Sequence, residues 1–292
     1  MANEVFSLFD LVPGKVLGDK YKIVAPSRQS GLSAAFEVTE EGSGRRLEMT
    51  VFPAALFDNE EQLEEYRQFL HGWKEVDSPY VVRVTDAINV CDTTIALVTE
   101  FPTGESLREW LRENRLLKAS RARRLGIQLC QGLERIHGAN LVHGDIKPQT
   151  IHVTEDRKGL QAQLVDGGIT PGLWNAKHLG DHTALIGTPY YAPVEQFGGD
   201  AADVQSDIYN VATVLFELVT GNLPWPGASF LEVFQAKLDR NAPSMSARAP
   251  EVDVDPALEE AVVRGLMADK RERYATAGEF RKALEAVKLE SE

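Results

Sequence analysis

Short runs of β-branched, aliphatic and aromatic residues fill the first hundred positions of the chain, each bounded by glycine, proline or polar turn residues. Such runs are typical of strands, and the turn Glu41-Gly42-Ser43-Gly44 between two of them indicates a hairpin. We expect these strands to form a small antiparallel sheet. The pattern predicts strands at residues 21–26, 33–40, 45–53, 80–90 and 94–101.

Helical spacing of apolar residues appears in three other parts of the chain. After Asn59, a helix N-cap residue, this spacing predicts a helix over residues 60–76. Ser120 is expected to cap a second helix, and residues 256–288 are expected to form terminal amphipathic helices. The chain beyond Gly104 is therefore predicted to be mainly helical. The fold class follows as α+β, with a small antiparallel β-sheet lobe carrying one helix and a large mainly α-helical lobe.

The segment Leu141–Val153 is predicted to be a loop between two buried runs. Pro148 prevents a helix through its middle, because proline lacks a backbone N–H and restricts the residue before it. The loop presents Asp145 and Lys147 two residues apart. A carboxylate and an ammonium so placed can accept a hydroxyl proton and steady a phosphate. A solvated ion pair in a surface turn is the alternative interpretation.

Composition narrows the class of protein. A chain of 292 residues with 43% hydrophobic residues suits one large domain or two lobes with a proper core. Its net charge of −13 disfavours nucleic acid and anionic membranes as partners. The two cysteines, Cys91 and Cys130, lack metal-site spacing and favour a reduced, cytoplasmic setting. No apolar run is long enough to span a bilayer, although the chain could be one domain of a longer, membrane-anchored parent.

Five ordered motifs together resemble the protein-kinase catalytic domain, especially the bacterial serine/threonine type. The motifs are HGDIKPQT at 143–150, VDGG at 165–168, PVE at 193–195, SDIYNVATVLFELVTG at 206–221 and RERYATAGEF at 271–280. The resemblance covers residues 14–288 and implies a bilobal protein-kinase-like fold. It implies an N-terminal extension at 1–13, a kinase-like N-lobe at 14–102 and a kinase-like C-lobe at 103–292.

The resemblance assigns roles to the polar residues of the central loop and the segment after it. Asp145 matches the family's catalytic base and Lys147 its phosphate-steadying lysine. Asp166 matches the aspartate that holds magnesium, whereas Thr150 replaces the asparagine that holds the second Mg²⁺. A hydroxyl can ligate magnesium less well than a carbonyl oxygen. Thr150 and Asp166 are thus the metal ligands if magnesium is bound.

At the nucleotide pocket the aligned residues depart from the family pattern. Thr50 replaces the lysine that holds the phosphates, and Glu48 replaces a small alanine that packs against adenine. In the hinge, which includes Glu100, Pro102 stands where a backbone N–H normally bonds adenine, and proline has none. His152 replaces the leucine of the pocket floor, and a satisfied buried imidazole is its alternative interpretation. These changes predict a degenerate nucleotide site.

Other positions of the pattern support the same interpretation. The phosphate-loop glycines are replaced by Arg28, Ser30 and Ser33, whose side chains obstruct close approach to phosphates. The alternative is a relocated cation, supplied by Arg28, Arg45 or Arg46. Gly144 replaces the arginine that normally grips a phosphorylated activation loop, and Gly167 replaces the phenylalanine of the magnesium segment. The indole of Trp73 is expected to fill the gap that Gly167 leaves; an ordinary core tryptophan is the alternative interpretation.

The structural positions, in contrast, match the family. Asp207 is expected to brace the central loop through backbone N–H groups, and Glu195 is expected to form a buried ion pair with Arg273. Gly187–Pro189 match the turn on the substrate side. Retention of these positions indicates that the fold is kept.

The sequence therefore predicts a pseudokinase, a kinase-like domain that needs no cofactor and acts as a signalling scaffold or allosteric regulator of a protein partner, such as an active kinase. Loss of several positioning groups should impair phosphoryl transfer even with Asp145 intact. The alternative is an atypical serine/threonine protein kinase that uses ATP and Mg with Asp145 as base. A third, minor alternative is another group transfer, such as AMP transfer.

Overall fold

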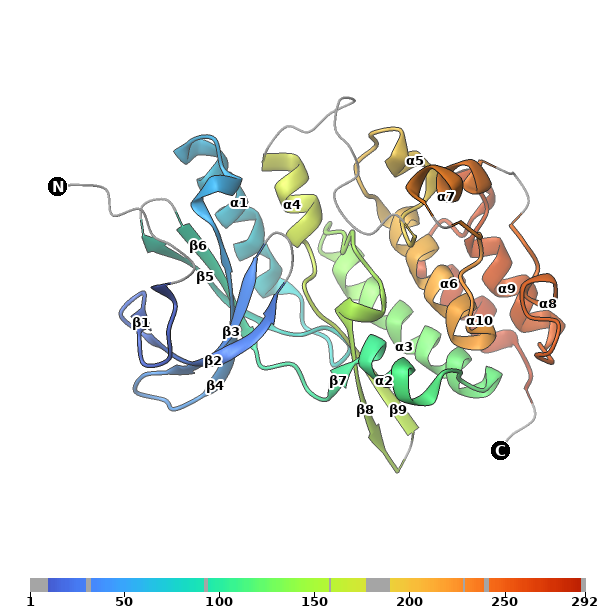
Figure 1. Ribbon diagram of the computed structural model, residues 1–292, viewed down its shortest axis with the longest axis horizontal. Helices are drawn as coiled ribbons and strands as arrows, with labels where there is room; N and C mark the ends of the chain where they lie inside the picture. Colours follow the sequence, from blue (N-terminus) through green and yellow to red (C-terminus); the bar gives the residue numbers. More distant parts are fainter. Residues whose placement is uncertain are drawn as a thin grey trace. The chain divides into compact units, whose positions relative to one another are not determined.

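The computed structural model describes residues 10–29, 33–91, 94–157, 159–176, 190–227, 229–238 and 242–289 (Figure 1). The chain divides into two compact units. The first contains the chain up to Asp77, Val82–Pro102 and a segment that begins at Gly172. The second contains Ser78–Val81, Thr103–Pro171 and the described residues from 190 onward.

The first unit is built on a six-stranded antiparallel sheet with strand order β1-β2-β3-β4-β6-β5 (Figure 1). The predicted strands are confirmed, and a two-residue strand, β1, precedes them. The register of β2 shifts on either side of Pro26, as expected of a residue that cannot donate to the ladder. The strands are β1 (Val16–Leu17), β2 (Tyr21–Gln29), β3 (Ala34–Glu40), β4 (Arg46–Phe52), β5 (Val84–Cys91) and β6 (Thr94–Glu100).

Strand β4 is buried on both faces. Leu47, Met49 and Val51 are at most 1% exposed and belong to the apolar core on one side of the sheet. Because successive side chains of a strand point to opposite faces, Glu48 and Thr50 lie on the other side. They too are buried, at 2% and 5% exposed. A carboxylate is therefore held inside the protein, which requires partners for its charge.

Helix α1 (Glu60–Gly72) begins where the sequence predicts, with the Asn59 side chain accepting a hydrogen bond from the Gln62 N–H at 2.9 Å. It ends earlier than predicted, because Trp73 opens a separate 3-10 turn, η3 (Trp73–Glu75). The Tyr66 ring of α1 packs edge-on against Phe52 at 5.2 Å. The helix is thereby fixed to the sheet.

The second unit is mainly helical, with α3 (Ala119–Gly138) packed against α6 (Val204–Thr220). Ser120 was predicted as the N-cap of α3, and this prediction is wrong. The backbone carbonyl of Lys118 accepts the first N–H groups of the helix, so Ser120 lies inside its first turn. The remaining helices are α2 (Leu107–Asn114), α4 (Ile169–Ala176), α5 (Val194–Phe197), α7 (Phe230–Lys237), α8 (Met245–Arg248), α9 (Pro256–Gly265) and α10 (Ala277–Ala286).

A small antiparallel sheet in the second unit was not predicted. It has the order β7-β8-β9, with β7 (Glu105–Ser106), β8 (Ile151–Asp156) and β9 (Gly159–Leu164). The loop that follows α3 enters β8 through a single 3-10 turn, η4 (Pro148–Thr150). The sheet and α3 together fix the two ends of this central loop. No helix in the described part of the chain is both long and apolar enough to cross a membrane.

Candidate functional site

The central loop is held by one buried aspartate of α6. Asp207 accepts hydrogen bonds from the backbone N–H groups of His143 at 2.9 Å and Gly144 at 2.8 Å. Its carboxylate also lies 2.9 Å from His137 Nε2. The predicted bracing role of Asp207 is therefore confirmed. His143 Nε2 lies 3.0 Å from the Val165 carbonyl oxygen, and burial lowers the pKa of this imidazole.

Asp145 and Lys147 are brought together by this loop. The Lys147 ammonium donates to the Asp145 carboxylate at 2.6 Å, and the two side chains are 16% and 21% exposed, respectively. Both groups are therefore reachable from solvent while holding each other in one orientation. A carboxylate in this position can accept a hydroxyl proton. The catalytic roles of the two residues stay predictions.

Thr150 uses its hydroxyl within the loop. The hydroxyl can donate to the carbonyl oxygens of Asp145 at 2.7 Å and Lys147 at 3.2 Å, and it accepts the Lys147 N–H at 3.1 Å. It closes the turn that leads into β8. Asp166 has a left-handed backbone, with φ of 61°, which a non-glycine residue seldom adopts. Their roles as metal ligands stay predictions; over the described ranges no cluster of three or more His, Cys, Asp or Glu residues could hold a metal ion.

In the first unit, Glu48 is bound by two residues of β2. Ser27 Oγ donates to Glu48 Oε2 at 2.7 Å, and Arg28 Nε donates to the same oxygen at 3.2 Å. A second nitrogen of Arg28 pairs with Oε1, so the contact is bidentate. The Arg28 side chain is 27% exposed and that of Glu48 is 2% exposed. The Arg28 side chain can extend from β2 across β3 to Glu48, because its neighbour in the register of β3 is the small Ala35.

The three arginines considered as relocated cations each face a carboxylate. Arg28 is bound to Glu48, as described. Arg46 makes a bidentate pair with Glu37 at 2.8 and 2.9 Å. Arg45 is 3.7 Å from Glu100, and both side chains are about half exposed. Each arginine thus already has an acidic neighbour within its own unit.

Thr50 lies in the sheet between Ala35 of β3 and Leu97 of β6. It is 5% exposed and carries no charge. In the family, the lysine that Thr50 replaces pairs with a glutamate, and the resemblance aligns that glutamate with Gln68 or Phe69 of α1, both uncharged. Gln68 donates to Glu64 on its own helix at 2.9 Å. The described structure therefore contains no lysine–glutamate pair at these aligned positions.

The hinge residues end β6. Glu100 is exposed, and its backbone N–H donates to the Arg83 carbonyl oxygen at 2.9 Å. Pro102 is buried and, as a proline, offers no N–H. His152 lies on β8 of the second unit, opposite Ser106 of β7, and is 9% exposed. The assignment of these residues to a nucleotide pocket stays a prediction.

Two glycines provide close contacts for α4, which was not predicted from the sequence. Gly144 has φ of 77°, and a Cβ there would lie 2.7 Å from the ring of Pro171. A Cβ on Gly172 would lie 2.6 Å from the Phe69 ring. The sequence signal for this helix was Pro171 in its first turn, a position that tolerates proline.

Trp73 is 2% exposed and so does not point to solvent, and its predicted place beside Gly167 stays a prediction.

The second unit contains the predicted Glu195–Arg273 ion pair. Its two nitrogen–oxygen distances are 2.7 and 2.9 Å, and the Arg273 side chain is fully buried. Arg273 also donates to the carbonyl oxygens of Met267 at 2.6 Å and Ala268 at 3.2 Å. The prediction of a buried architectural pair is confirmed. Gly187–Pro189 lie outside the described residues.

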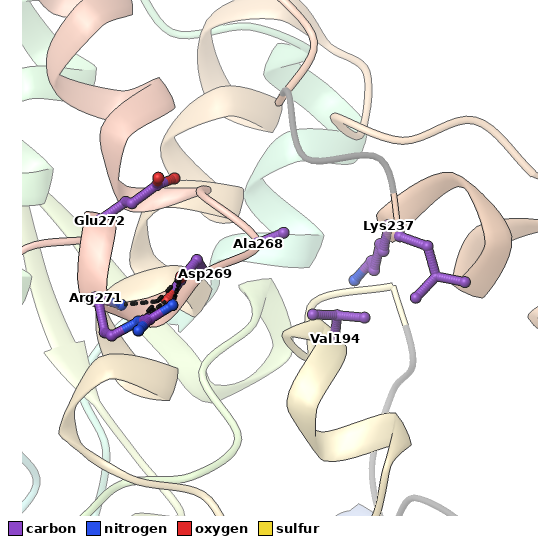
Figure 2. Close-up of a pocket in the computed structure, with 7 residues that line it drawn as sticks. Val194, Lys237, Ala268, Asp269, Arg271 and Glu272 are labelled. Carbon is purple, nitrogen blue, oxygen red and sulfur yellow. Dashed lines mark hydrogen bonds and ion pairs between the residues drawn. The ribbon is translucent and has the colours of Figure 1, made fainter.

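A buried lysine that was not predicted from the sequence, Lys237, lines a cavity in the second unit (Figure 2). Lys237 is 1% exposed and donates to the carbonyl oxygens of Tyr190 at 3.0 Å and Ala192 at 2.6 Å. Burial lowers its pKa to about 7. The cavity of about 320 Å³ beside it is lined by Val194, Lys237, Leu238, Ala268, Asp269, Arg271 and Glu272. The only sequence signal was a lysine at the end of the apolar run FLEVFQAK.

Comparisons with known proteins agree with this geometry. The family model described as "Protein kinase domain" matches residues 32–283. The chain is 26% identical over 281 residues to serine/threonine-protein kinase pkn3 of Myxococcus xanthus, covering 95% of this chain and 51% of that protein. It is 30% identical over 278 residues to a probable serine/threonine-protein kinase, CE0033, of Corynebacterium efficiens, covering 93% and 42%.

A solved structure shows the same fold. The kinase domain of PknI from Mycobacterium tuberculosis superposes with a TM-score of 0.72 at 17% identity, covering 94% of this chain and 98% of that one. The predicted α+β protein-kinase-like fold is therefore confirmed. The chain spans about half the length of the curated relatives it matches, or less.

Proposed function

The chain belongs to the protein kinase domain family, in its bacterial serine/threonine branch, and we propose that within this family it is a pseudokinase. It keeps the kinase framework and acts as a signalling scaffold or allosteric regulator, without efficient phosphoryl transfer. Its partner is a protein, either an active kinase or another signalling protein. The domain works without ATP and magnesium as cofactors.

The observation that carries this proposal is the buried Glu48 carboxylate with its Arg28 and Ser27 partners. In related kinases a small residue at this position packs against adenine. Here a charged side chain occupies the position, and its charge is matched by Arg28. Displacing Glu48 would leave a buried charge without compensation, at a cost of about 3–5 kcal/mol. A nucleotide would have to supply that energy before gaining any affinity.

Two further positions weaken nucleotide binding. Thr50 is neutral and buried, so it supplies no positive charge for phosphate oxygens. Pro102 lacks the N–H of the usual hinge bond, a loss of about 1 kcal/mol or more in a desolvated site. Arg28, Arg45 and Arg46 each lie against a carboxylate, which argues against a relocated cation.

The framework suited to a scaffold is intact. Asp207 braces the central loop, and Glu195 pairs with Arg273 in the interior. These contacts stabilise the helical unit whether or not phosphate is transferred. A stable surface for a protein partner is what a scaffold requires.

One observation favours an atypical active kinase as the second candidate. Asp145 and Lys147 are in contact at 2.6 Å and partly exposed, as a base and a phosphate-steadying lysine would be. In that case Asp166 and Thr150 would hold magnesium, and the substrate would be a seryl or threonyl hydroxyl. Asp145→Asn would abolish activity in such an enzyme and leave partner binding unchanged in a scaffold.

Thermal unfolding with and without saturating ATP and Mg²⁺ tests the proposal. A ligand at a hundred times its dissociation constant adds about 2.7 kcal/mol of stability, which should raise the unfolding midpoint by several degrees. We expect a single cooperative transition with no shift. A shift of several degrees would overturn the proposal, and phosphotransfer assays of the domain and its Asp145→Asn variant would then test the second candidate.

A further inference from the structure

A cavity of about 360 Å³ in the first unit carries an unusual charge distribution. It is lined by Arg45, Lys74, Arg83, Val84, Thr85 and Glu100. In the sheet register Glu100 pairs with Leu47, the neighbour of Glu48 in β4. By the same register Val84 pairs with Thr99, which pairs with Glu48, so the lining is not confined to the sheet face opposite that of Glu48. This basic cavity includes Glu100 of the hinge, but its lining does not include Glu48, Thr50, Pro102 or His152.

Two of its cations have no acidic partner among the described residues. Neither Lys74 nor Arg83 forms an ion pair or a side-chain hydrogen bond within the described part of the chain. Arg45 is 3.7 Å from Glu100, a long contact between half-exposed side chains that contributes little. The whole chain has 44 acidic and 31 basic residues, so three basic side chains around one cavity oppose its overall charge.

Ordered backbone positions these side chains. Lys74 lies in η3 directly after the buried Trp73. Arg83 accepts the Glu100 N–H at its carbonyl oxygen, at 2.9 Å, immediately before β5. The Thr85 hydroxyl donates to the Val98 carbonyl oxygen at 3.0 Å and so contributes no donor to the cavity. Binding in the cavity would therefore depend on the three cations.

We propose that the basic cavity binds a phosphoryl dianion, carried by a phosphoserine or phosphothreonine residue or by free phosphate. Two guanidinium groups and one ammonium provide the bidentate and point-charge donors that phosphate oxygens accept. With Glu100 included, the lining has a net charge of about two positive, which matches a phosphomonoester above its second pKa. A carboxylate, with one negative charge, would leave this charge half neutralised. The proposal does not depend on whether the domain transfers phosphate.

Calorimetric titration of the whole domain tests the site. The probes are inorganic phosphate, an acetylated and amidated Gly-Gly-pThr-Gly-Gly peptide, and the same peptide with unmodified threonine. We expect both phosphorylated probes to bind and the unmodified peptide not to bind. Lys74→Gln and Arg83→Gln should each weaken binding about tenfold, as expected for a lost charge-assisted hydrogen bond.

Two further variants separate a local site from bulk charge. Glu100→Gln removes the repelling carboxylate and should strengthen phosphate binding severalfold, a gain that general destabilisation would not produce. Lys22→Gln removes an exposed positive charge on β2, outside the cavity lining, and should leave affinity unchanged.

The source of the dianion follows from the two affinities. Peptide binding about tenfold or more tighter than phosphate would identify a phosphorylated protein segment, and equal affinities would identify free phosphate; both support the site. Failure of both probes to bind would overturn the proposal. An equal loss of affinity in Lys22→Gln and Arg83→Gln would overturn it as well, because binding would then reflect overall charge.

Discussion

Both units contain an arginine–glutamate pair with a buried partner, and the two pairs differ in their surroundings. Arg273 is fully buried, pairs with Glu195 and also donates to the backbone carbonyls of Met267 and Ala268. Arg28 is 27% exposed, and the residue of its pair that is deeply buried is Glu48. The Arg273 pair ties chain segments together, whereas the Arg28 pair stabilises a carboxylate on one face of a sheet.

This difference separates contacts that the fold requires from a contact that it does not require. A kinase framework requires the Arg273 pair and the Asp207 brace whether or not it binds a nucleotide. The fold does not require a glutamate in the middle of β4, because an apolar residue could be buried there and would need no charged partner. The proposed loss of nucleotide binding would account for Glu48 and its arginine, which the scaffold does not require.

The largest effect should come from breaking the Arg273 pair. Arg273→Ala removes the described donors to the Glu195 carboxylate and the arginine's hydrogen bonds to the carbonyls of Met267 and Ala268, so the free energy of unfolding should fall by about 3–5 kcal/mol. Urea denaturation measures this loss. Arg271→Ala, two residues away and 88% exposed, is the matched control and should leave the midpoint unchanged. Equal effects of the two variants would show that the buried Arg273 pair contributes no more to stability than an exposed arginine does.

A smaller effect is expected at the Arg28 pair. Arg28→Met leaves Glu48 with only Ser27 as a described side-chain hydrogen-bond partner, and should cost about 2–3 kcal/mol. Combining it with Glu48→Leu removes both charges and should recover most of that loss. A double-mutant cycle in urea would then show a coupling energy of about 1–3 kcal/mol. Additive effects would mean that the two residues act independently and that Arg28 does not stabilise the carboxylate.

The smallest expected effect is the pH dependence of stability that the buried amine of Lys237 produces. An unfolded lysine titrates near 10.5, whereas burial lowers the folded pKa to about 7. Between these values the unfolded state binds more protons, so this residue makes stability rise with pH, and its destabilising effect is complete below the folded pKa. Its ammonium donates to the backbone carbonyl oxygens of Tyr190 and Ala192.

Lys237→Met should abolish this dependence. The difference in free energy of unfolding between variant and parent should change by about 1.4 kcal/mol per pH unit between about pH 7.5 and 9, in the direction that favours the parent at high pH. Urea melts at several pH values measure it, with the exposed Lys22→Met as control. Parallel stability curves would show that the amine remains charged inside the protein.

Much of the fold was accessible from the sequence, because alternation and helical spacing reflect burial directly. Strand β4 and the start of α1 at Asn59 are examples. The sheet β7-β8-β9 was not predicted, since β7 has two residues and shows no alternation. Ser120 was wrongly chosen as a cap because the backbone carbonyl of Lys118, two residues earlier, already starts α3.

For the candidate site, the spacing of the motifs predicted that Asp207 braces the central loop and that this loop presents Asp145 and Lys147 together. The partner of Glu48 was not predicted, since β2 and β4 pair through β3 and the register of β2 shifts around Pro26. The available signal was opposite charge on two strands that flank the small Ala35. Lys237 was also missed, because its burial depends on three aromatic rings from distant segments, namely Phe197, Tyr209 and Trp225.

The bidentate contact between Arg28 and Glu48 also constrains how this protein can evolve. Glu48→Ala alone would leave the Arg28 guanidinium without its carboxylate partner, and Arg28→Gly alone would leave the buried Glu48 carboxylate without its cation. Each one-step path therefore passes through a destabilised intermediate. Substitutions at these two positions should therefore be epistatic, because each is tolerated better when the other residue changes as well.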